Sequence, residues 1–221
     1  MSASIDTKFV GPIKEFMGRR CFIVGSGPSL DDLDLASLRG QVVWALNASA
    51  TLFDDRPGLF WLLRDRRAIR EILPRLAHWK RMRVVTHVKA FSQIETDTQK
   101  PRHAYVYEER SVVHTRTIAE DALQLARRAG CSDAVLVGVD CKAPPGRPYA
   151  KALDWKDCAW YDRKDPVPES KACASMRRAL ADLATSGVLG DFPVYSASVS
   201  LDVFPHLEYA HAVAGRTPQG V

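Results

Sequence analysis

The chain has few cysteines and no apolar run of the length that a membrane span requires. Its five cysteines, Cys21, Cys131, Cys141, Cys158 and Cys173, are odd in number and include no Cys-x-x-Cys pair. This usage argues against a disulfide framework and a zinc site, and we expect buried thiols in a reducing compartment. A membrane helix takes roughly 20 apolar residues in succession, and no segment approaches that length. The N-terminus also lacks the apolar core of a secretion signal, so we expect an unprocessed, cytoplasmic protein.

Acidic residues are outnumbered by basic ones, a balance typical of proteins that attract anions. The 221 residues include 31 Lys and Arg against 26 Asp and Glu, which gives a net charge of +5. Basic side chains gather in residues 62–83, "LLRDRRAIREILPRLAHWKRMR". This run is either a solvated helix face or a surface for a polyanion such as an acidic glycan or DNA.

No internal repeat is visible, and short apolar runs alternate instead with helical patterns. The apolar runs predict strands at residues 20–25, 41–47, 59–64, 82–87, 103–108, 133–140 and 192–198. The helical patterns lie at residues 29–40, 66–80, 115–130 and 170–185. This alternation predicts an α/β fold, a single Rossmann-like domain over residues 1–221 with a mostly parallel sheet. Residues 141–169, rich in proline, aromatics and charge, are expected to form an inserted lid.

Polar side chains follow several of the expected strands. In parallel sheets of this kind ligands bind beyond the carboxyl ends of the strands, which makes these residues candidates for a site. They are Ser26, Ser29, Asn47, Arg64, Asp65, Thr86, His87 and Asp140. His87 is a candidate acid or base. Asp140 is a candidate for catalysis or substrate binding, or alternatively a cap for the loop backbone.

The stretch "GSGPS" at residues 25–29 follows the first expected strand. Gly25 and Gly27 allow another group to approach the main chain closely, and Ser29 is expected to cap the helix that follows. The N-terminus of such a helix can hold a phosphate. The Gly-Lys-Ser/Thr of the P-loop and the third glycine of the dinucleotide fingerprint are both absent. The turn is therefore either an anion site or a tight strand–helix connection.

Two blocks of the sequence together carry a family resemblance. "FIVGSGPSLDDLDLASL", followed by "VVWALNAS", and "TIAEDALQLARRAGCSDAVLVGVDCKAPPGRPYA" resemble the bacterial lipooligosaccharide sialyltransferases and the related motility-accessory-factor and 6-hydroxymethylpterin pyrophosphokinase-like proteins. The sialyltransferase resemblance implies a Rossmann-like fold that binds a cytidine monophosphate donor without metal. It further implies that Ser26, Gly27 and Asn47 line the nucleotide. Thr117 would lie near its phosphate, and Tyr149 would donate a hydrogen bond to the leaving phosphate.

The sequence departs from the sialyltransferase pattern at several positions. Those enzymes usually carry asparagine in place of Ser26 and Ser-Gly in place of Ile118 and Ala119, and two further departures fall on groups that take part in the reaction. Glu169 stands where those enzymes have their catalytic histidine, just before a Ser-Lys that begins a helix, and Lys142 stands where they have a phosphate-binding tyrosine. Glu169 is either the general base or an acid that stabilises the helix dipole. Lys142 and Arg147 could neutralise a diphosphate in place of the tyrosine.

These features predict a nucleotide-dependent transferase. The leading hypothesis is a glycosyltransferase that moves a sugar from a nucleotide-sugar donor to a hydroxyl acceptor on a glycan or a modified DNA base, with no cofactor and no metal. One alternative is a pyrophosphokinase that transfers diphosphate from ATP to a pterin-type alcohol, with Mg²⁺ held by Asp140 and Asp65. A second alternative is a non-catalytic module that binds a nucleotide or nucleic acid.

Overall fold

The computed structural model describes most of the chain outside the expected lid. The described residues are 12–64, 66–76, 78–81, 83–87, 104–107, 112, 116–141, 150, 153 and 169–217. The strands are β1 (Arg20–Val24), β2 (Val42–Leu46), β3 (Leu59–Leu63), β4 (Arg83–His87), β5 (Ala104–Tyr107), β6 (Asp133–Val137) and β7 (Val194–Ser196). The α-helices are α1 (Arg66–Leu76), α3 (Ile118–Arg128), α4 (Glu169–Thr185) and α5 (Tyr209–Val213). The 3-10 helices are η1 (Pro28–Asp32), η2 (Leu35–Leu38) and η3 (Asn47–Leu52).

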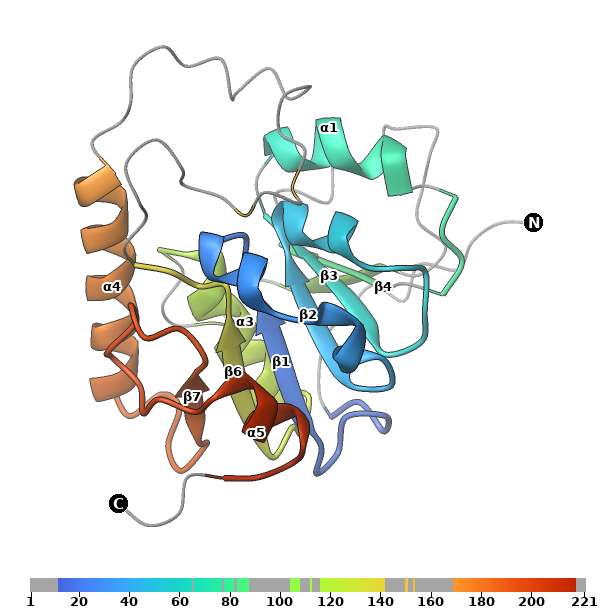
Figure 1. Cartoon of the computed structure of the whole chain (residues 1–221). Helices are drawn as coiled ribbons and strands as arrows, with labels where there is room; N and C mark the ends of the chain where they lie inside the picture. The colour runs from blue at the N-terminus through green and yellow to red at the C-terminus, as the bar shows by residue number, and fades with distance from the viewer. Residues whose placement is uncertain are drawn as a thin grey trace.

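All of these strands join one parallel sheet in the order β5-β4-β3-β2-β1-β6-β7 (Figure 1). The predicted α/β fold with a parallel sheet is confirmed. The chain builds outward from β1 to β5 and then returns to place β6 on the other side of β1. In such sheets the crevice for ligands lies at this reversal, beyond the carboxyl ends of the two strands. The register sets Val24 beside both Ala45 and Val137.

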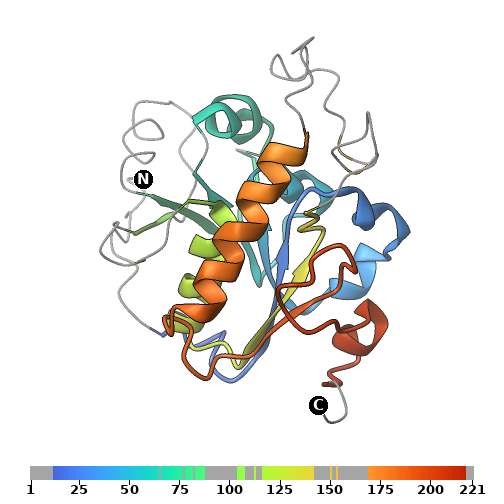
Figure 2. The ribbon, with the colours of Figure 1, turned by 90° about the vertical axis from the view of Figure 1, so that its left-hand side faces the viewer.

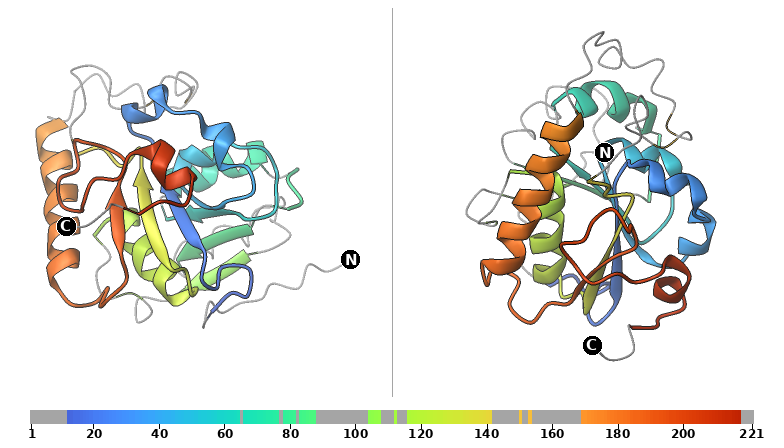
Figure 3. Two further views of the ribbon diagram at one scale, coloured as in Figure 1. Left: turned by 60° about the horizontal axis from the view of Figure 1, so that its bottom comes forward. Right: turned by 60° about the vertical axis from the view of Figure 1, so that its left-hand side comes forward.

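Helices cover both faces of the sheet. On one face α3 and α4 lie side by side (Figure 2). The opposite face carries the 3-10 helices, α1 and α5 (Figure 3). Within β1 the side chains alternate between the two cores: Ile23 packs on the α3 side and Phe22 on the other. Because both faces are buried, the central strands are apolar apart from Arg20 and Asp133 at the starts of β1 and β6, which explains the apolar runs of the sequence.

The helix predicted over residues 29–40 is wrong. η1 and η2 replace it, and η1 begins after Gly27 without a side-chain cap. Aspartates are frequent in this segment, and their short side chains compete with helical hydrogen bonding by binding nearby main-chain groups. Asp34 does so, since its carboxylate accepts a hydrogen bond from the Ala36 N–H at 3.0 Å. Two 3-10 helices this short have only a weak dipole. The strong α-helix dipole expected beside the glycine turn is therefore missing.

The length of α1 and the burial of the cysteines agree with the sequence predictions in part. Helix α1 ends at Leu76, four residues short of the predicted end at residue 80. Three thiols are buried and the Cys173 thiol is partly buried, whereas Cys158 lies outside the described residues. Of the expected lid, only Cys141, Ala150, Leu153 and the main chain of Glu169 belong to the described part. No helix in the described ranges is both long and apolar enough to cross a membrane.

Candidate functional site

The glycine turn after β1 packs tightly against the loop after β6. The N–H of Gly25 donates to the carbonyl of Val137 at 2.8 Å, and the N–H of Gly27 donates to the carbonyl of Gly138 at 2.7 Å. A Cβ on Gly25 would lie 2.4 Å from the Gly138 oxygen, and one on Gly27 would lie 2.4 Å from Asp140 Oδ2. Both distances are far below van der Waals contact. The two glycines are therefore required by the close approach of another part of the chain.

Asp140 fastens this contact through Ser29. Its Oδ2 accepts the Ser29 N–H at 2.8 Å, and its Oδ1 accepts the Ser29 hydroxyl at 2.8 Å and lies 3.5 Å from the Ser200 hydroxyl. The carboxyl group is buried, with 8% of the residue exposed. Of the two roles expected for Asp140, the structure shows the cap. Service as a base or as a Mg²⁺ ligand would compete with these hydrogen bonds.

Ser26 is the residue of the turn that remains open to a ligand. Its carbonyl accepts the N–H of Ala150 at 3.0 Å, and the residue is partly exposed. Within the described part of the chain, neither its main-chain N–H nor its hydroxyl makes a hydrogen bond. The main-chain amides of Gly25, Gly27 and Ser29 are all committed inside the protein. A phosphate held by several amides of this turn, as in a P-loop, is therefore not what this geometry offers.

Asn47 begins η3 directly after β2 and has two energetically costly features. Its φ is +48°, which makes it the one non-glycine residue with positive φ in the described ranges. Its side-chain Oδ1 is buried and has no hydrogen-bond donor among the described residues. The left-handed backbone, which asparagine tolerates better than most residues, costs at most roughly 1–2 kcal/mol, and an unpaired buried acceptor costs about 1–3 kcal/mol. Costs of this kind are found where a residue serves a ligand, and a hydrogen bond from a ligand would satisfy the amide oxygen.

The main chain of Asn47 is also held in place from the neighbouring strand. The indole N–H of Trp61 donates to the Asn47 carbonyl at 2.6 Å. Trp61 is fully buried in β3, so this hydrogen bond fixes Asn47 from a rigid part of the core. The unusual backbone of Asn47 is thus built into the packing of β2 against β3.

A second cluster of polar side chains, Arg64, Tyr107 and Asp121, lies where β3 and β5 end. Asp121, in the first turn of α3, is buried, and its Oδ2 accepts from the Tyr107 hydroxyl at 2.6 Å and from Arg64 Nη1 at 3.3 Å. Burial raises the pKa of Asp121 to about 6, although Tyr107 and Arg64 act to lower it. Burial likewise raises the pKa of the Tyr107 hydroxyl. The ring of His87 packs edge-on against Tyr107 at 5.3 Å between centroids.

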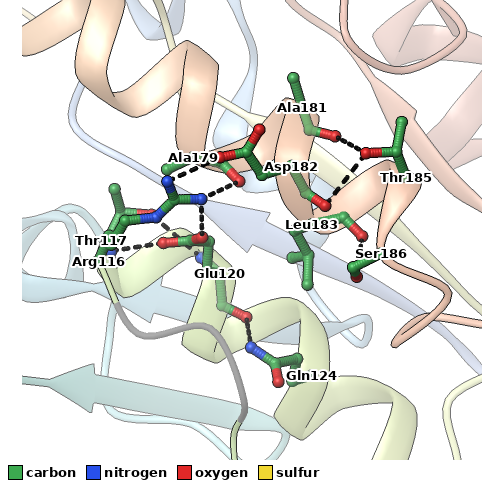
Figure 4. Close-up of polar contacts among 10 residues, drawn as sticks. All are labelled: Arg116, Thr117, Glu120, Gln124, Ala179, Ala181, Asp182, Leu183, Thr185 and Ser186. Carbon is green, nitrogen blue, oxygen red and sulfur yellow. Dashed lines mark hydrogen bonds and ion pairs between the residues drawn. The ribbon is translucent and has the colours of Figure 1, made fainter.

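Thr86 and Thr117, two further candidates, have structural hydrogen bonds. The buried Thr86 hydroxyl donates to the Leu63 carbonyl at 2.7 Å and joins β4 to β3. Thr117 caps α3 in a reciprocal pair: its Oγ1 accepts the Glu120 N–H at 3.3 Å, and the Glu120 carboxylate accepts the Thr117 N–H at 2.7 Å (Figure 4). A hydroxyl that accepts in this way can still donate its own proton to a ligand.

Arg116 connects the start of α3 to the middle of α4. Its guanidinium lies 3.4 Å from the Glu120 carboxylate and 2.7 Å from that of Asp182, and it also donates to the Ala179 carbonyl at 3.3 Å (Figure 4).

Glu169 is the first residue of α4, ten residues before Ala179, and a helix rises about 1.5 Å per residue. The first turn of α4 therefore projects well beyond the level at which α3 begins.

The candidates fall into a row along the carboxyl edge of the sheet. Ser26, Asn47 and Arg64 follow the neighbouring strands β1, β2 and β3, while Asp140 follows β6 on the other side of β1. Asp65, Lys142, Arg147 and Tyr149 lie outside the described residues, and Glu169 is described only as a helix position. Among the described side chains, no three of His, Cys, Asp and Glu are grouped as a metal site.

Asp121 and Tyr107 could not be recognised as site residues from the sequence. An acid in the first turn of an amphipathic helix is common because it complements the helix dipole, so Asp121 carried no distinguishing signal. Tyr107 is one of two tyrosines in "AYVY" and looks like an ordinary strand residue. Their pairing depends on β5 lying at the edge of the sheet, two strands from Arg64, and the sequence did not reveal that order.

Comparison with solved structures finds a protein that shares the fold. The MAf glycosyltransferase from Magnetospirillum magneticum AMB-1 superimposes with a TM-score of 0.57 at 13% sequence identity, over 90% of this chain and 35% of that protein. This chain thus spans about a third of its length. The likeness agrees with the resemblance to motility-accessory-factor proteins and, at this identity, shows the fold. No protein-family model and no curated protein sequence matches the chain.

Proposed function

We propose that this chain is a nucleotide-sugar-dependent glycosyltransferase whose donor binds across the carboxyl ends of β6, β1 and β2. The observation that carries the proposal is Asn47, with its left-handed backbone and its buried, unsatisfied amide oxygen. It stands beside the glycine turn, at the edge where parallel sheets bind nucleotides. The fold shared with a MAf glycosyltransferase supports the reaction class.

In this proposal the nucleotide contacts Asn47 and Ser26. The Asn47 side chain accepts a hydrogen bond from the nucleotide, and Ser26 donates from its free N–H and hydroxyl. Gly25, Gly27 and the Ser29–Asp140 pair give the turn its shape without touching the donor. Since the turn offers so few free amides, the phosphate is neutralised by side chains. Lys142 and Arg147 would neutralise its charge, and the Thr117 and Tyr149 hydroxyls would donate hydrogen bonds to it; of these four residues Thr117 belongs to the described part.

The transfer step needs a base for the acceptor and a stabilised leaving group. The acceptor oxygen forms a bond to the anomeric carbon of the sugar while the bond from that carbon to the nucleotide phosphate breaks. The electron pair leaves with the phosphate, and the acceptor proton passes to the base. We assign the base to Glu169, on the projecting end of α4, with His87 as the second choice. Asp140 is less suited because Ser29 occupies its carboxylate.

The experiment is a thermal-shift screen of the purified protein against nucleoside mono-, di- and triphosphates and sugar nucleotides, with and without Mg²⁺. A ligand at 100 times its Kd stabilises the folded state by about 2.7 kcal/mol, which such a screen detects readily. We expect stabilisation by a nucleotide and its sugar derivative without Mg²⁺, followed by sugar transfer in a product assay. Stabilisation by ATP with Mg²⁺ alone would favour the pyrophosphokinase, and binding without turnover would favour the non-catalytic module.

The matched variant is Asn47→Gly. Glycine adopts the left-handed conformation without cost but has no amide to offer a ligand. The variant should keep the melting temperature of the free protein and lose the ligand-induced shift. An undiminished shift in Asn47→Gly would contradict the proposed donor site.

A further inference from the structure

Arg64 stands at the carboxyl end of β3, one strand beyond Asn47, and most of its guanidinium has no hydrogen-bond partner among the described residues. The side chain is 34% exposed. Its one side-chain hydrogen bond or ion pair among the described residues is the 3.3 Å approach of Nη1 to Asp121. An arginine has five N–H donors in a planar fork that suits the paired oxygens of a carboxylate or phosphate.

Asp121 contacts Arg64 through one of its two carboxylate oxygens. Its side chain is 1% exposed, and one oxygen, Oδ2, accepts from both Arg64 and Tyr107. The other oxygen, Oδ1, is buried with no donor among the described residues. A two-point pair with the guanidinium would satisfy both oxygens and bind more strongly. The one-point contact leaves Oδ1 unpaired, and it leaves the rest of the guanidinium available.

We infer that Arg64 binds an oxyanion of the bound substrate, a carboxylate or a phosphate, and that Asp121 and Tyr107 are its positioning residues. The inference rests on the proposed function for the identity of the substrate. Neighbouring parallel strands lie about 4.8 Å apart, so the end of β3 is roughly 10 Å from the glycine turn after β1. The oxyanion therefore belongs to the part of the complex remote from Ser26. It is carried either by the sugar of the donor or by the acceptor.

The first experiment measures ligand affinity in Arg64→Gln. Titration calorimetry compares cytidine monophosphate, a cytidine monophosphate sugar with a carboxylate, and a nucleotide sugar without one. If the donor carries the oxyanion, Arg64→Gln weakens binding of the acidic sugar nucleotide at least about tenfold and leaves the other two unchanged, since one charge-assisted hydrogen bond is worth that factor. If the acceptor carries it, donor affinities stay constant and the KM for an anionic acceptor rises instead. Wild-type values for all of these would overturn the inference.

The second experiment separates positioning from a purely structural role. Asp121→Ala alone should weaken binding of the same anionic ligand by a factor similar to Arg64→Gln, while the double variant should show no further loss. Such non-additivity is expected when one residue acts through another. Unchanged affinity in Asp121→Ala would assign Asp121 to stability only, and losses that multiply in the double variant would show that it does not act through Arg64; either result would contradict the positioning role. Arg128→Gln, which removes an exposed charge from the opposite end of α3, is the control and should leave affinity unchanged.

A third measurement keeps the inference testable if no nucleotide binds. Inorganic phosphate and citrate are added to wild type and Arg64→Gln in a thermal-shift series at constant ionic strength. An anion-induced shift that disappears in Arg64→Gln supports the oxyanion site even if the glycosyltransferase proposal fails. Equal shifts in both proteins, together with no nucleotide binding, would contradict both.

Discussion

Asp140 accepts hydrogen bonds from both the main-chain N–H and the hydroxyl of Ser29, a residue 111 positions earlier in the chain. The pair joins the turn after β1 to the loop after β6 at the point where the strand order reverses. A phosphate-binding turn would keep these donors for its ligand. Here the carboxylate of Asp140 occupies the place that a bound anion would take. Within the described part of the chain, Ser26 is therefore the residue of the turn whose N–H and hydroxyl are available to a ligand.

Replacement of Gly25 by alanine should destabilise the fold. The new Cβ would lie 2.4 Å from the carbonyl oxygen of Gly138, and a main-chain oxygen in a β-connection has little room to move. Overpacking of this kind costs about 1–3 kcal/mol in free energy of unfolding, measured by urea denaturation. Ser26→Ala is the control, since its hydroxyl has no partner among the described residues and stability should change by less than about 0.5 kcal/mol. Equal midpoints for wild type and Gly25→Ala would disprove the close approach.

Asp140→Asn should cost more stability than Ser29→Ala. The asparagine can keep both contacts only by accepting the Ser29 N–H and donating to the Ser29 hydroxyl, so two charge-assisted hydrogen bonds become neutral ones, at a cost of about 1–3 kcal/mol. Ser29→Ala removes the hydroxyl and keeps the main-chain hydrogen bond, so we expect a loss of about 0.5–1.5 kcal/mol. Urea denaturation of the two variants gives the order directly. The reverse order would show that the carboxylate does not serve as the cap.

The fold class could be predicted from the sequence because burial on both faces makes each central strand a continuous apolar run. "RCFIV" and "DAVLV" show this clearly, and they pair as neighbours in the sheet. The strand order could not be predicted, since pairing between β6 and β1 depends on contacts far apart in the chain. The helix expected at residues 29–40 failed because its aspartates bind the local backbone, as Asp34 does.

Individual site residues were harder to foresee than the edge on which they lie. The strand-end rule placed Ser26, Asn47 and Arg64 along the carboxyl edge. It could not distinguish a residue that donates hydrogen bonds to a ligand from one that donates them inside the protein. Ser29 is of the second kind, because both of its hydrogen bonds go to Asp140. Asp121 escaped notice because its burial depends on the packing of α3 against the sheet.

Removal of the α3 cap should lower stability by a measurable amount. Thr117→Ala loses the side-chain acceptor for the Glu120 N–H, at a cost of about 1 kcal/mol, whereas Thr117→Ser keeps the hydroxyl and should remain near wild type. Both variants are compared by thermal and urea denaturation. Because Glu120 is fully buried, its carboxylate must keep its contacts with Arg116 and the Thr117 N–H in either variant. Equal losses in the two variants would assign the effect to the methyl group.

The buried Asp121 should make stability fall as the pH rises between about 4 and 6. Its pKa is raised from 3.8 to about 6, mainly by burial, so in this window the native state binds a proton more tightly than the unfolded chain does. Proton linkage then favours the native state at the low end of the window, and the advantage is lost once the pH passes the native pKa. A rise of about 2 in pKa corresponds to at most about 3 kcal/mol.

Asp121→Asn isolates this contribution. The amide keeps the shape of the side chain and an acceptor oxygen but cannot ionise. Urea denaturation of wild type and variant at pH values from 4 to 7 gives the difference in unfolding free energy, in which the titration of all other groups cancels. The unfolding free energy of wild type relative to that of Asp121→Asn should fall as the pH rises to about 6. Above that pH it should remain constant, because Asp121 is then ionised in both the native and the unfolded state. A difference independent of pH would mean that Asp121 titrates as it does in the unfolded chain, and its burial beside Tyr107 would then have no electrostatic cost.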